Sequence, residues 1–119
     1  MQNRRKTDRH YLLDFVRVYD AATHQKIGNL VDITLGGARI VGQEPIPEGQ
    51  AIRLRLELTS EVAEKPFLEF PTRSKWCLPD LKPNLYNIGF EILDLSAEDS
   101  LILQKLINTF GFQENEPAS

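Results

Sequence analysis

Two segments of the sequence alternate strictly between apolar and polar residues, and this pattern constrains the fold more than any other feature. In residues 50–58 the apolar set is Ile52, Leu54, Leu56 and Leu58, and the charged set between them is Arg53, Arg55 and Glu57. Residues 84–92 repeat the pattern with Tyr86, Ile88, Phe90 and Ile92 against Asn87, Gly89 and Glu91. Because side chains alternate across a strand, each segment predicts a β-strand with one buried and one solvent-facing side.

Four further segments indicate strands. Residues 13–20 and 26–33 flank a polar turn, and residues 38–41 follow two glycines and precede a stretch rich in proline. Between the two alternating segments, one face is expected to carry Leu68, Phe70, Thr72, Ser74 and Trp76. Pro71 lies within this segment and cannot donate a backbone hydrogen bond, so it indicates a sheet edge or a bulge. Six short strands predict an antiparallel barrel or sandwich, and closure into a barrel is favoured because it removes unpaired strand edges.

The end of the chain changes from strand to helical period. Ser96 is followed three residues later by Asp99, which resembles a capping box, and Gly111 is a suitable helix stop. The intervening apolar stripe consists of Ile102, Leu103, Leu106, Ile107 and Phe110. We therefore expect a C-terminal helix packed on a mainly β barrel. The predicted organisation is a flexible basic arm over residues 1–12, the barrel with its helix over residues 13–111, and a disordered tail over residues 112–119.

Composition excludes several classes of function. With 119 residues and a net charge of -3, the chain has the size of one domain and lacks the basic balance of a general nucleic-acid binder. The single cysteine, Cys77, fits a reducing compartment, and neither a signal peptide nor a membrane-spanning apolar run is visible, so we expect a cytoplasmic protein. His10 and His24 have no metal-ligand spacing with Cys77. No pattern selects an acid–base pair or a nucleophile, so we expect neither an enzyme, nor a metal, nor a cofactor.

The first motif with a chemical meaning is a pair of arginines near the start, Arg5 and Arg9, in a basic stretch that also holds Arg4 and Lys6. A guanidinium is planar and permanently charged, pairs bidentately with phosphate, and stacks on aromatic bases. Such a pair is therefore suited to clamp a phosphorylated nucleotide. The commoner origin of two basic residues at a terminus is a solvated tail, and the pair alone does not decide between them.

The second motif is the segment from Asp32 to Gly37. If Ile33 enters the core, Asp32 and Thr34 project outward together, because they are two residues apart on a strand. A carboxylate matches the two adjacent donors of a guanine edge, and a threonine hydroxyl can both donate and accept. Gly36 and Gly37 allow a tight turn and a close approach of a ligand to the backbone. The alternative is an ordinary turn in which Asp32 and Thr34 bond their own backbone.

The order of the two motifs, before a six-strand pattern and a terminal helix, resembles the PilZ domain family. The signature of that family is Arg-x-x-x-Arg followed by Asp/Asn-x-Ser-x-x-Gly. Arg5 and Arg9 match the first part, whereas Asp32, Thr34 and Gly37 match the second, with threonine in place of serine. Trp76 and the segment Tyr86-Asn87-Ile88-Gly89-Phe90 also resemble the closing strands of the family. The likeness covers roughly residues 4–110.

The resemblance implies a six-stranded antiparallel barrel that binds the bacterial second messenger cyclic di-GMP. Carried over by position, Arg5 and Arg9 would hold phosphate and stack on guanine. Asp32 and Thr34 would recognise a guanine edge, and Gly37 would leave room for it.

Two further arginines extend the implied site. In the family, an arginine at the position of Arg4 accompanies binding of a stacked ligand dimer, so the resemblance implies two cyclic di-GMP molecules per chain. Arg39 lies two residues after Gly37 and is either another ligand contact or a surface strand arginine.

The function expected from these residues is that of a receptor or adaptor. Ligand binding would reorder the N-terminal arm, and an effector protein yet to be identified would recognise the changed surface. No nucleic-acid polymer and no membrane insertion are expected. Two alternatives remain: a PilZ-like adaptor that works through protein contacts without nucleotide, and a small barrel for single-stranded nucleic acid, which would need exposed aromatic residues and a basic groove.

Overall fold

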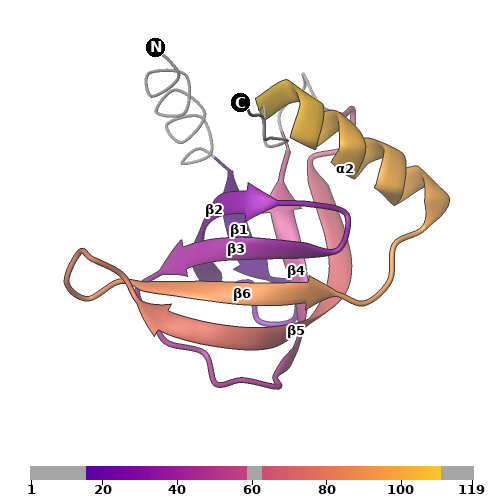
Figure 1. Cartoon of the computed structure of the whole chain (residues 1–119). Helices are drawn as coiled ribbons and strands as arrows, with labels where there is room; N and C mark the ends of the chain where they lie inside the picture. The colour runs from indigo at the N-terminus through magenta and orange to yellow at the C-terminus, as the bar shows by residue number, and fades with distance from the viewer. Residues whose placement is uncertain (1–15, 59–62, 111–119) are drawn as a thin grey trace, which may run out of the picture.

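The computed structural model describes residues 16–58 and 63–110, which form a closed barrel of six antiparallel strands and one helix (Figure 1). The elements are β1 (Arg17–Asp20), β2 (Lys26–Ile33), β3 (Gly37–Gly42), β4 (Ala51–Glu57), β5 (Phe67–Pro79), β6 (Tyr86–Ile92) and α2 (Ala97–Phe110). Around the barrel the order is β1-β2-β3-β6-β5-β4. The predicted fold is confirmed. The proposed arm over residues 1–12 and tail over residues 112–119 lie outside the described residues.

The core follows from the alternation in the sequence. Leu54 and Leu56 of β4 are fully buried, whereas Arg53 between them is exposed, as expected for a strand with one wet face. Ile88 and Phe90 of β6 are buried in the same way. The other buried apolar residues are Val16, Val18, Leu30, Ile33, Ala38, Ile40, Leu68, Phe70, Leu103, Leu106 and Ile107. The barrel interior is thus a packed apolar core that continues into the helix.

A bulge in β5 overturns one prediction. Leu68, Phe70, Thr72 and Ser74 face the interior as expected, but the register with β6 shifts between Ser74 and Trp76. The extra residue reverses the alternation, because two residues of the bulged strand then oppose one of its partner. Trp76 therefore faces outward and is 40% exposed, whereas Cys77 packs against the core. The assignment of Trp76 to the same face as Ser74 was wrong for this reason.

Pro71 lies where the pairing between β5 and β6 stops. The Leu93 N–H donates to the Pro71 carbonyl at 2.9 Å, and the ladder to β6 begins at the next residue, Thr72, opposite Ile92. In the Leu93–Pro71 pair, the second hydrogen bond would run from the N–H of residue 71 to the Leu93 carbonyl, and proline has no N–H to donate. Pro71 is therefore tolerated because it stands where the pairing with β6 ends, although it is paired with Arg53 of β4 and the closed barrel has no edge strand at this point.

Strands β2 and β3 approach each other unusually closely. A Cβ atom placed on Gly28 would collide with the Val41 carbonyl, and one on Gly42 would collide with the Ile27 carbonyl. Both glycines are buried within strands, where a glycine otherwise weakens the structure and marks a close backbone approach. The absence of a side chain at these two positions therefore permits the β2–β3 pairing.

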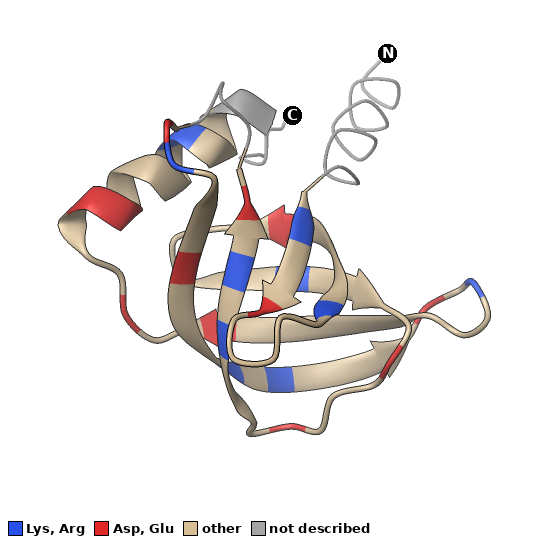
Figure 2. Ribbon diagram, turned by 180° about the vertical axis from the view of Figure 1, so that it is seen from behind, with Lys and Arg blue, Asp and Glu red and all other residues tan. Residues whose placement is uncertain are grey.

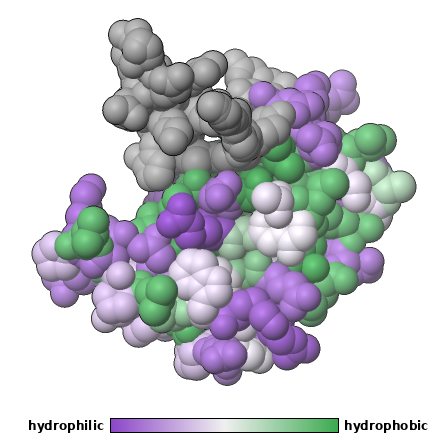
Figure 3. Space-filling view, viewed as in Figure 1, coloured by the Kyte–Doolittle hydropathy of each residue, from purple (hydrophilic) through white to green (hydrophobic). Residues whose placement is uncertain are grey.

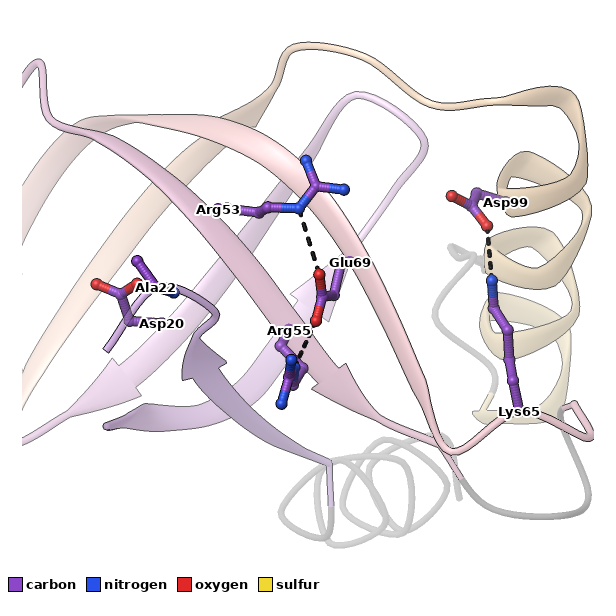
Figure 4. Close-up of polar contacts among 7 residues, drawn as sticks. All are labelled: Asp20, Ala22, Arg53, Arg55, Lys65, Glu69 and Asp99. Carbon is purple, nitrogen blue, oxygen red and sulfur yellow. Dashed lines mark hydrogen bonds and ion pairs between the residues drawn. The ribbon is translucent and has the colours of Figure 1, made fainter. Parts of the chain in front are cut away.

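Helix α2 closes one end of the barrel (Figure 1). It begins as predicted, with the Asp99 N–H donating to Ser96 Oγ at 3.0 Å, and it buries Leu103, Leu106 and Ile107. Lys65 in the β4–β5 connection pairs with Asp99 at 3.2 Å (Figure 4). The side chain of Phe110 and the proposed stop at Gly111 lie outside the described residues. No helix in the described ranges is long and apolar enough to cross a membrane.

The outer face of β4 and β5 carries a compact charge cluster (Figure 4). Glu69 accepts hydrogen bonds from Arg53 Nε at 3.3 Å and from Arg55 Nε at 2.5 Å, and the Arg55 guanidinium lies 4.6 Å from the centre of the Phe67 ring. The hydrogen bond from Arg55 is the main reason that the pKa of Glu69 lies below its ordinary value. Basic and acidic residues are interspersed over the rest of this side of the barrel (Figure 2).

This cluster predicts a pH dependence of stability. A carboxylate with a lowered pKa in the folded state contributes stability above its unfolded pKa, near 4.5, and the contribution is lost as the pH falls through the folded value. We expect Glu69→Gln to lower the unfolding free energy at pH 7 by about 1 kcal/mol or less, and the difference from wild type to shrink as the pH is lowered below 4.5. Thermal unfolding across this pH range measures it, with Glu44→Gln as an exposed control. An equal stability difference between wild type and Glu69→Gln at the acidic and neutral ends of the pH range would contradict a lowered pKa of Glu69 as its cause.

Candidate functional site

The segment from Asp32 to Gly37 forms the end of β2 and the turn into β3. Ile33 is 1% exposed and belongs to the core, whereas Asp32 and Thr34 are exposed, so both polar side chains project outward as predicted. The Thr34 N–H donates to the Gly37 carbonyl at 2.8 Å and closes the turn. The geometry therefore presents a carboxylate on the outer wall and a tight turn beside it.

The Thr34 hydroxyl is engaged within this turn. Its oxygen accepts hydrogen bonds from the N–H groups of Gly36 and Gly37, both at 3.2 Å, and the hydroxyl donates to the Gly37 carbonyl at 3.5 Å. This is the ordinary backbone-bonding turn that was the alternative interpretation of the motif, as far as Thr34 is concerned. Asp32 makes no such bond to the described backbone.

The surroundings of the two glycines in the turn differ. Gly36 has open space where a Cβ would stand, and its carbonyl accepts a hydrogen bond from the Ile92 N–H at 3.0 Å. A Cβ on Gly37 would lie 2.8 Å from the Phe90 carbonyl oxygen. Gly37 is thus needed for the close approach of β3 to β6, independently of any ligand, and Gly36 leaves the space above the turn free.

A row of side chains crosses the outer face of four neighbouring strands. Asp32 of β2 stands opposite Arg39 of β3, Arg39 stands opposite Gly89 of β6, and Gly89 stands opposite Trp76 of β5. The Trp76 indole occupies the place that a Gly89 side chain would fill, so it lies against the β6 backbone. Within the described part of the chain neither Asp32 nor Arg39 has an ion-pair partner. A carboxylate, a guanidinium and an aromatic ring therefore share one surface.

The surroundings of this row are mixed in character. Lys75 pairs with Glu91 at 3.6 Å beside Trp76, and both side chains are about half exposed. At the turn, Leu35 is 48% exposed and borders a pocket of about 300 Å³ lined also by Ile92, Leu93, Asp94, Leu95 and Ser100. Strands β3, β6 and β5 face the viewer in Figure 1, and Figure 3 shows hydrophilic and apolar residues interspersed on this side.

Trp76 is a candidate site residue that sequence reasoning missed. Its placement depends on the bulge after Ser74, which the alternating pattern does not reveal. The one available signal was Gly89, a glycine on the outer face of an otherwise regular strand, because such a glycine indicates that something packs closely on the backbone.

The predicted phosphate-binding residues Arg4, Arg5 and Arg9 lie outside the described residues. The described chain starts at Val16, whose carbonyl accepts a hydrogen bond from the Leu30 N–H at 2.9 Å. Val16 thus lies beside Leu30 of β2, two residues before Asp32 along the strand. Arg9 precedes Val16 by seven residues, a span of at most about 25 Å, so the segment is long enough for Arg9 to reach Asp32.

No group of three or more histidine, cysteine, aspartate or glutamate residues that could hold a metal ion is found within residues 16–58 and 63–110.

Comparisons with known proteins agree with this fold. A family model described as PilZ domain matches residues 3–109 of the chain. Among solved structures, the Bacillus subtilis inhibitor of motility, MotI/DgrA, is similar with a TM-score of 0.55 and 17% sequence identity. The match covers 83% of this chain and 48% of that protein, so the chain spans about half the length of the structure it resembles. At this identity the similarity shows a shared fold. No curated protein matches the chain.

Proposed function

From the membership of this chain in the PilZ domain family, which the match over residues 3–109 establishes, we propose that it is a cyclic di-GMP receptor that signals to a partner protein. PilZ domains are receptor and adaptor domains rather than enzymes. The ligand and the signalling role are the parts of the proposal that go beyond membership in the family.

The observation that carries the proposal is the row formed by Asp32, Arg39 and Trp76 on the outer barrel wall. The Asp32 carboxylate offers two acceptors for the ring N–H and the exocyclic amine of guanine. The Arg39 guanidinium suits either a phosphate or the opposite edge of the base. Trp76 offers a ring on which a base can stack. Groups suited to three functions that a guanine nucleotide requires therefore lie on one face, on β2, β3 and β5, with β6 between β3 and β5.

The N-terminal arginines complete the proposed mechanism. Arg5 and Arg9 would bind the phosphates and stack on guanine, and Arg4 would support a second ligand molecule. Fixing a backbone residue costs roughly 1–2 kcal/mol, so several charge-assisted bonds, each worth about 1.5–3 kcal/mol, must form together. Binding would thereby change the arrangement of residues 1–12 against the barrel, and the partner protein would recognise the new surface.

The structure gives less support to a barrel for single-stranded nucleic acid. Such a protein needs a basic groove along its surface. On the outer face of β4 and β5, however, Arg53 and Arg55 are both bonded to Glu69, and Arg17 pairs with Glu57 at 3.3 Å. The positive charge of these strands is therefore largely neutralised.

Isothermal titration calorimetry with cyclic di-GMP tests the proposal. We expect saturable binding with two ligand molecules per chain, and a ratio near one in the Arg4→Ala variant. Lys6→Ala is the matched control, because it removes a neighbouring positive charge and is expected to keep the ratio of two. A wild-type ratio near one would contradict the ligand dimer alone. If cyclic di-GMP gives no binding heat, and a labelled cyclic di-GMP also does not bind, the receptor proposal is contradicted. That result would favour an adaptor that works without nucleotide.

A further inference from the structure

The β2–β3 turn assigns Thr34 a role different from the one its position in the motif suggests. A hydroxyl has one hydrogen to donate and two lone pairs with which to accept. In the structure the oxygen accepts from the Gly36 and Gly37 N–H groups, and the hydrogen is directed at the Gly37 carbonyl. The two accepting positions of this oxygen are thus used inside the turn, and its hydrogen is directed back at the Gly37 carbonyl.

The turn that Thr34 closes is also fixed from outside. Its Gly36 carbonyl accepts from the Ile92 N–H at 3.0 Å at the end of β6, and Gly37 stands against the Phe90 carbonyl. The backbone between Thr34 and Gly37 is therefore held both by the hydroxyl and by strand β6. A change at the hydroxyl leaves the second set of contacts in place, so its effect remains local.

The turn sets the position of Asp32. Turn geometry fixes the register of the two strands that it joins, and here it places Ile33 opposite Ala38 and Asp32 opposite Arg39. A register shift between Leu30 and Asp32 lies immediately before this pair, so the few pairs between the shift and the turn depend on the turn for their alignment. Loosening the turn would therefore displace Asp32 relative to Arg39.

We propose that Thr34 is a positioning residue, whose hydroxyl holds the turn and thereby aligns Asp32 with Arg39, rather than a direct contact of the nucleotide. This inference rests on the proposed function, because its consequence is a change in cyclic di-GMP affinity. Serine can make the same hydrogen bonds, whereas valine keeps the shape of threonine and makes none of them. The additional methyl of threonine restricts χ1 and favours a fixed hydroxyl.

The chain provides a matched control. Thr23 lies in the β1–β2 turn, and its hydroxyl accepts a hydrogen bond from the Gln25 N–H at 3.2 Å. Thr23 thus has the same kind of role as Thr34, in a turn at the opposite end of β2. Thr23→Val removes a turn hydroxyl without touching the row that contains Asp32 and Arg39.

The experiment compares Thr34→Val, Thr34→Ser, Thr23→Val and wild type by NMR without ligand and by calorimetry with cyclic di-GMP. For Thr34→Val we expect the Gly36 and Gly37 amide protons to take the larger temperature coefficients of unbonded N–H groups in the empty protein. We expect its affinity to fall about tenfold or more, because two backbone donors lose their acceptor. Thr34→Ser should keep the wild-type temperature coefficients of the Gly36 and Gly37 amides, and its affinity should lie within about threefold of wild type. Thr23→Val should keep the wild-type affinity.

Two results would overturn the inference while leaving the receptor intact. One is a loss of affinity in Thr34→Val with unchanged glycine amides, which would show a direct contact with the ligand. The other is a loosened turn with wild-type affinity, which would show that the turn does not align the site. If the wild-type protein does not bind cyclic di-GMP, the proposed function fails with the inference, and that result is recognised from the wild-type titration alone.

Discussion

Replacement of Asp32 by alanine is expected to reduce the affinity for cyclic di-GMP by about 100-fold or more. The carboxylate would accept two charge-assisted hydrogen bonds from guanine, each worth about 1.5–3 kcal/mol, and 1.4 kcal/mol corresponds to a tenfold change in affinity. Asp32 is exposed and makes no hydrogen bond to the described backbone, so its loss should leave the melting temperature within about 2 °C of wild type. Calorimetry and thermal unfolding of the same preparation separate the two effects.

Two variants make the Asp32 experiment specific. Glu44→Ala removes the same charge from an exposed position in the β3–β4 connection and should bind like wild type. Asp32→Asn keeps one acceptor oxygen but replaces the other with a donor, so its affinity should lie between those of wild type and Asp32→Ala. Near-wild-type affinity in Asp32→Ala would mean that the guanine edge is recognised elsewhere, even if the protein binds cyclic di-GMP.

Replacement of Gly28 by alanine should have a large effect on stability. The added methyl group would collide with the Val41 carbonyl and also crowd the Ile40 side chain, at a point where backbone rather than a flexible side chain must move. Overpacking that forces backbone shifts costs about 1–3 kcal/mol and occasionally more, and a collision with a backbone carbonyl places this position at the upper end of that range. For a domain of this size we expect the melting temperature to fall by about 10 °C or more, or the protein to fail to fold.

Gly36→Ala is the matched control for this prediction. A Cβ at Gly36 meets nothing within 4 Å, so the variant should melt within about 2 °C of wild type. The same added methyl group thus tests close approach at one glycine and open space at the other. A Gly28→Ala variant as stable as Gly36→Ala would show that β2 and β3 separate easily, contrary to the pairing described above.

The sequence predicted the architecture because the alternation of apolar and polar residues has the period of a strand. Ile52 to Leu58 and Tyr86 to Ile92 have their apolar residues inward, and Ser96 caps the helix at its predicted start. What the pattern could not show was an insertion that changes the period. The single extra residue near Lys75 moved Trp76 from the expected core face to the surface.

The candidate site was predictable only in part. The outward direction of Asp32 and Thr34 followed from the burial of Ile33, which hydrophobicity alone indicated. The alignment of Asp32 with Arg39, in contrast, depends on strand register and on the irregularity after Leu30, which are set by tertiary contacts. The engagement of the Thr34 hydroxyl in its own turn was one of two interpretations of the motif, and choosing between them required coordinates.

The outward position of Trp76 has a spectroscopic consequence. It is the only tryptophan of the chain, and its indole lies at the surface, against Gly89 and on the same row as Arg39. Intrinsic emission therefore reports on the outer wall of the barrel rather than on its apolar core. A guanine stacked on the ring would quench that emission, so the tryptophan fluorescence of the unlabelled protein would report ligand binding. Unfolding is better followed by circular dichroism, because an indole that is already 40% exposed changes its surroundings only in part.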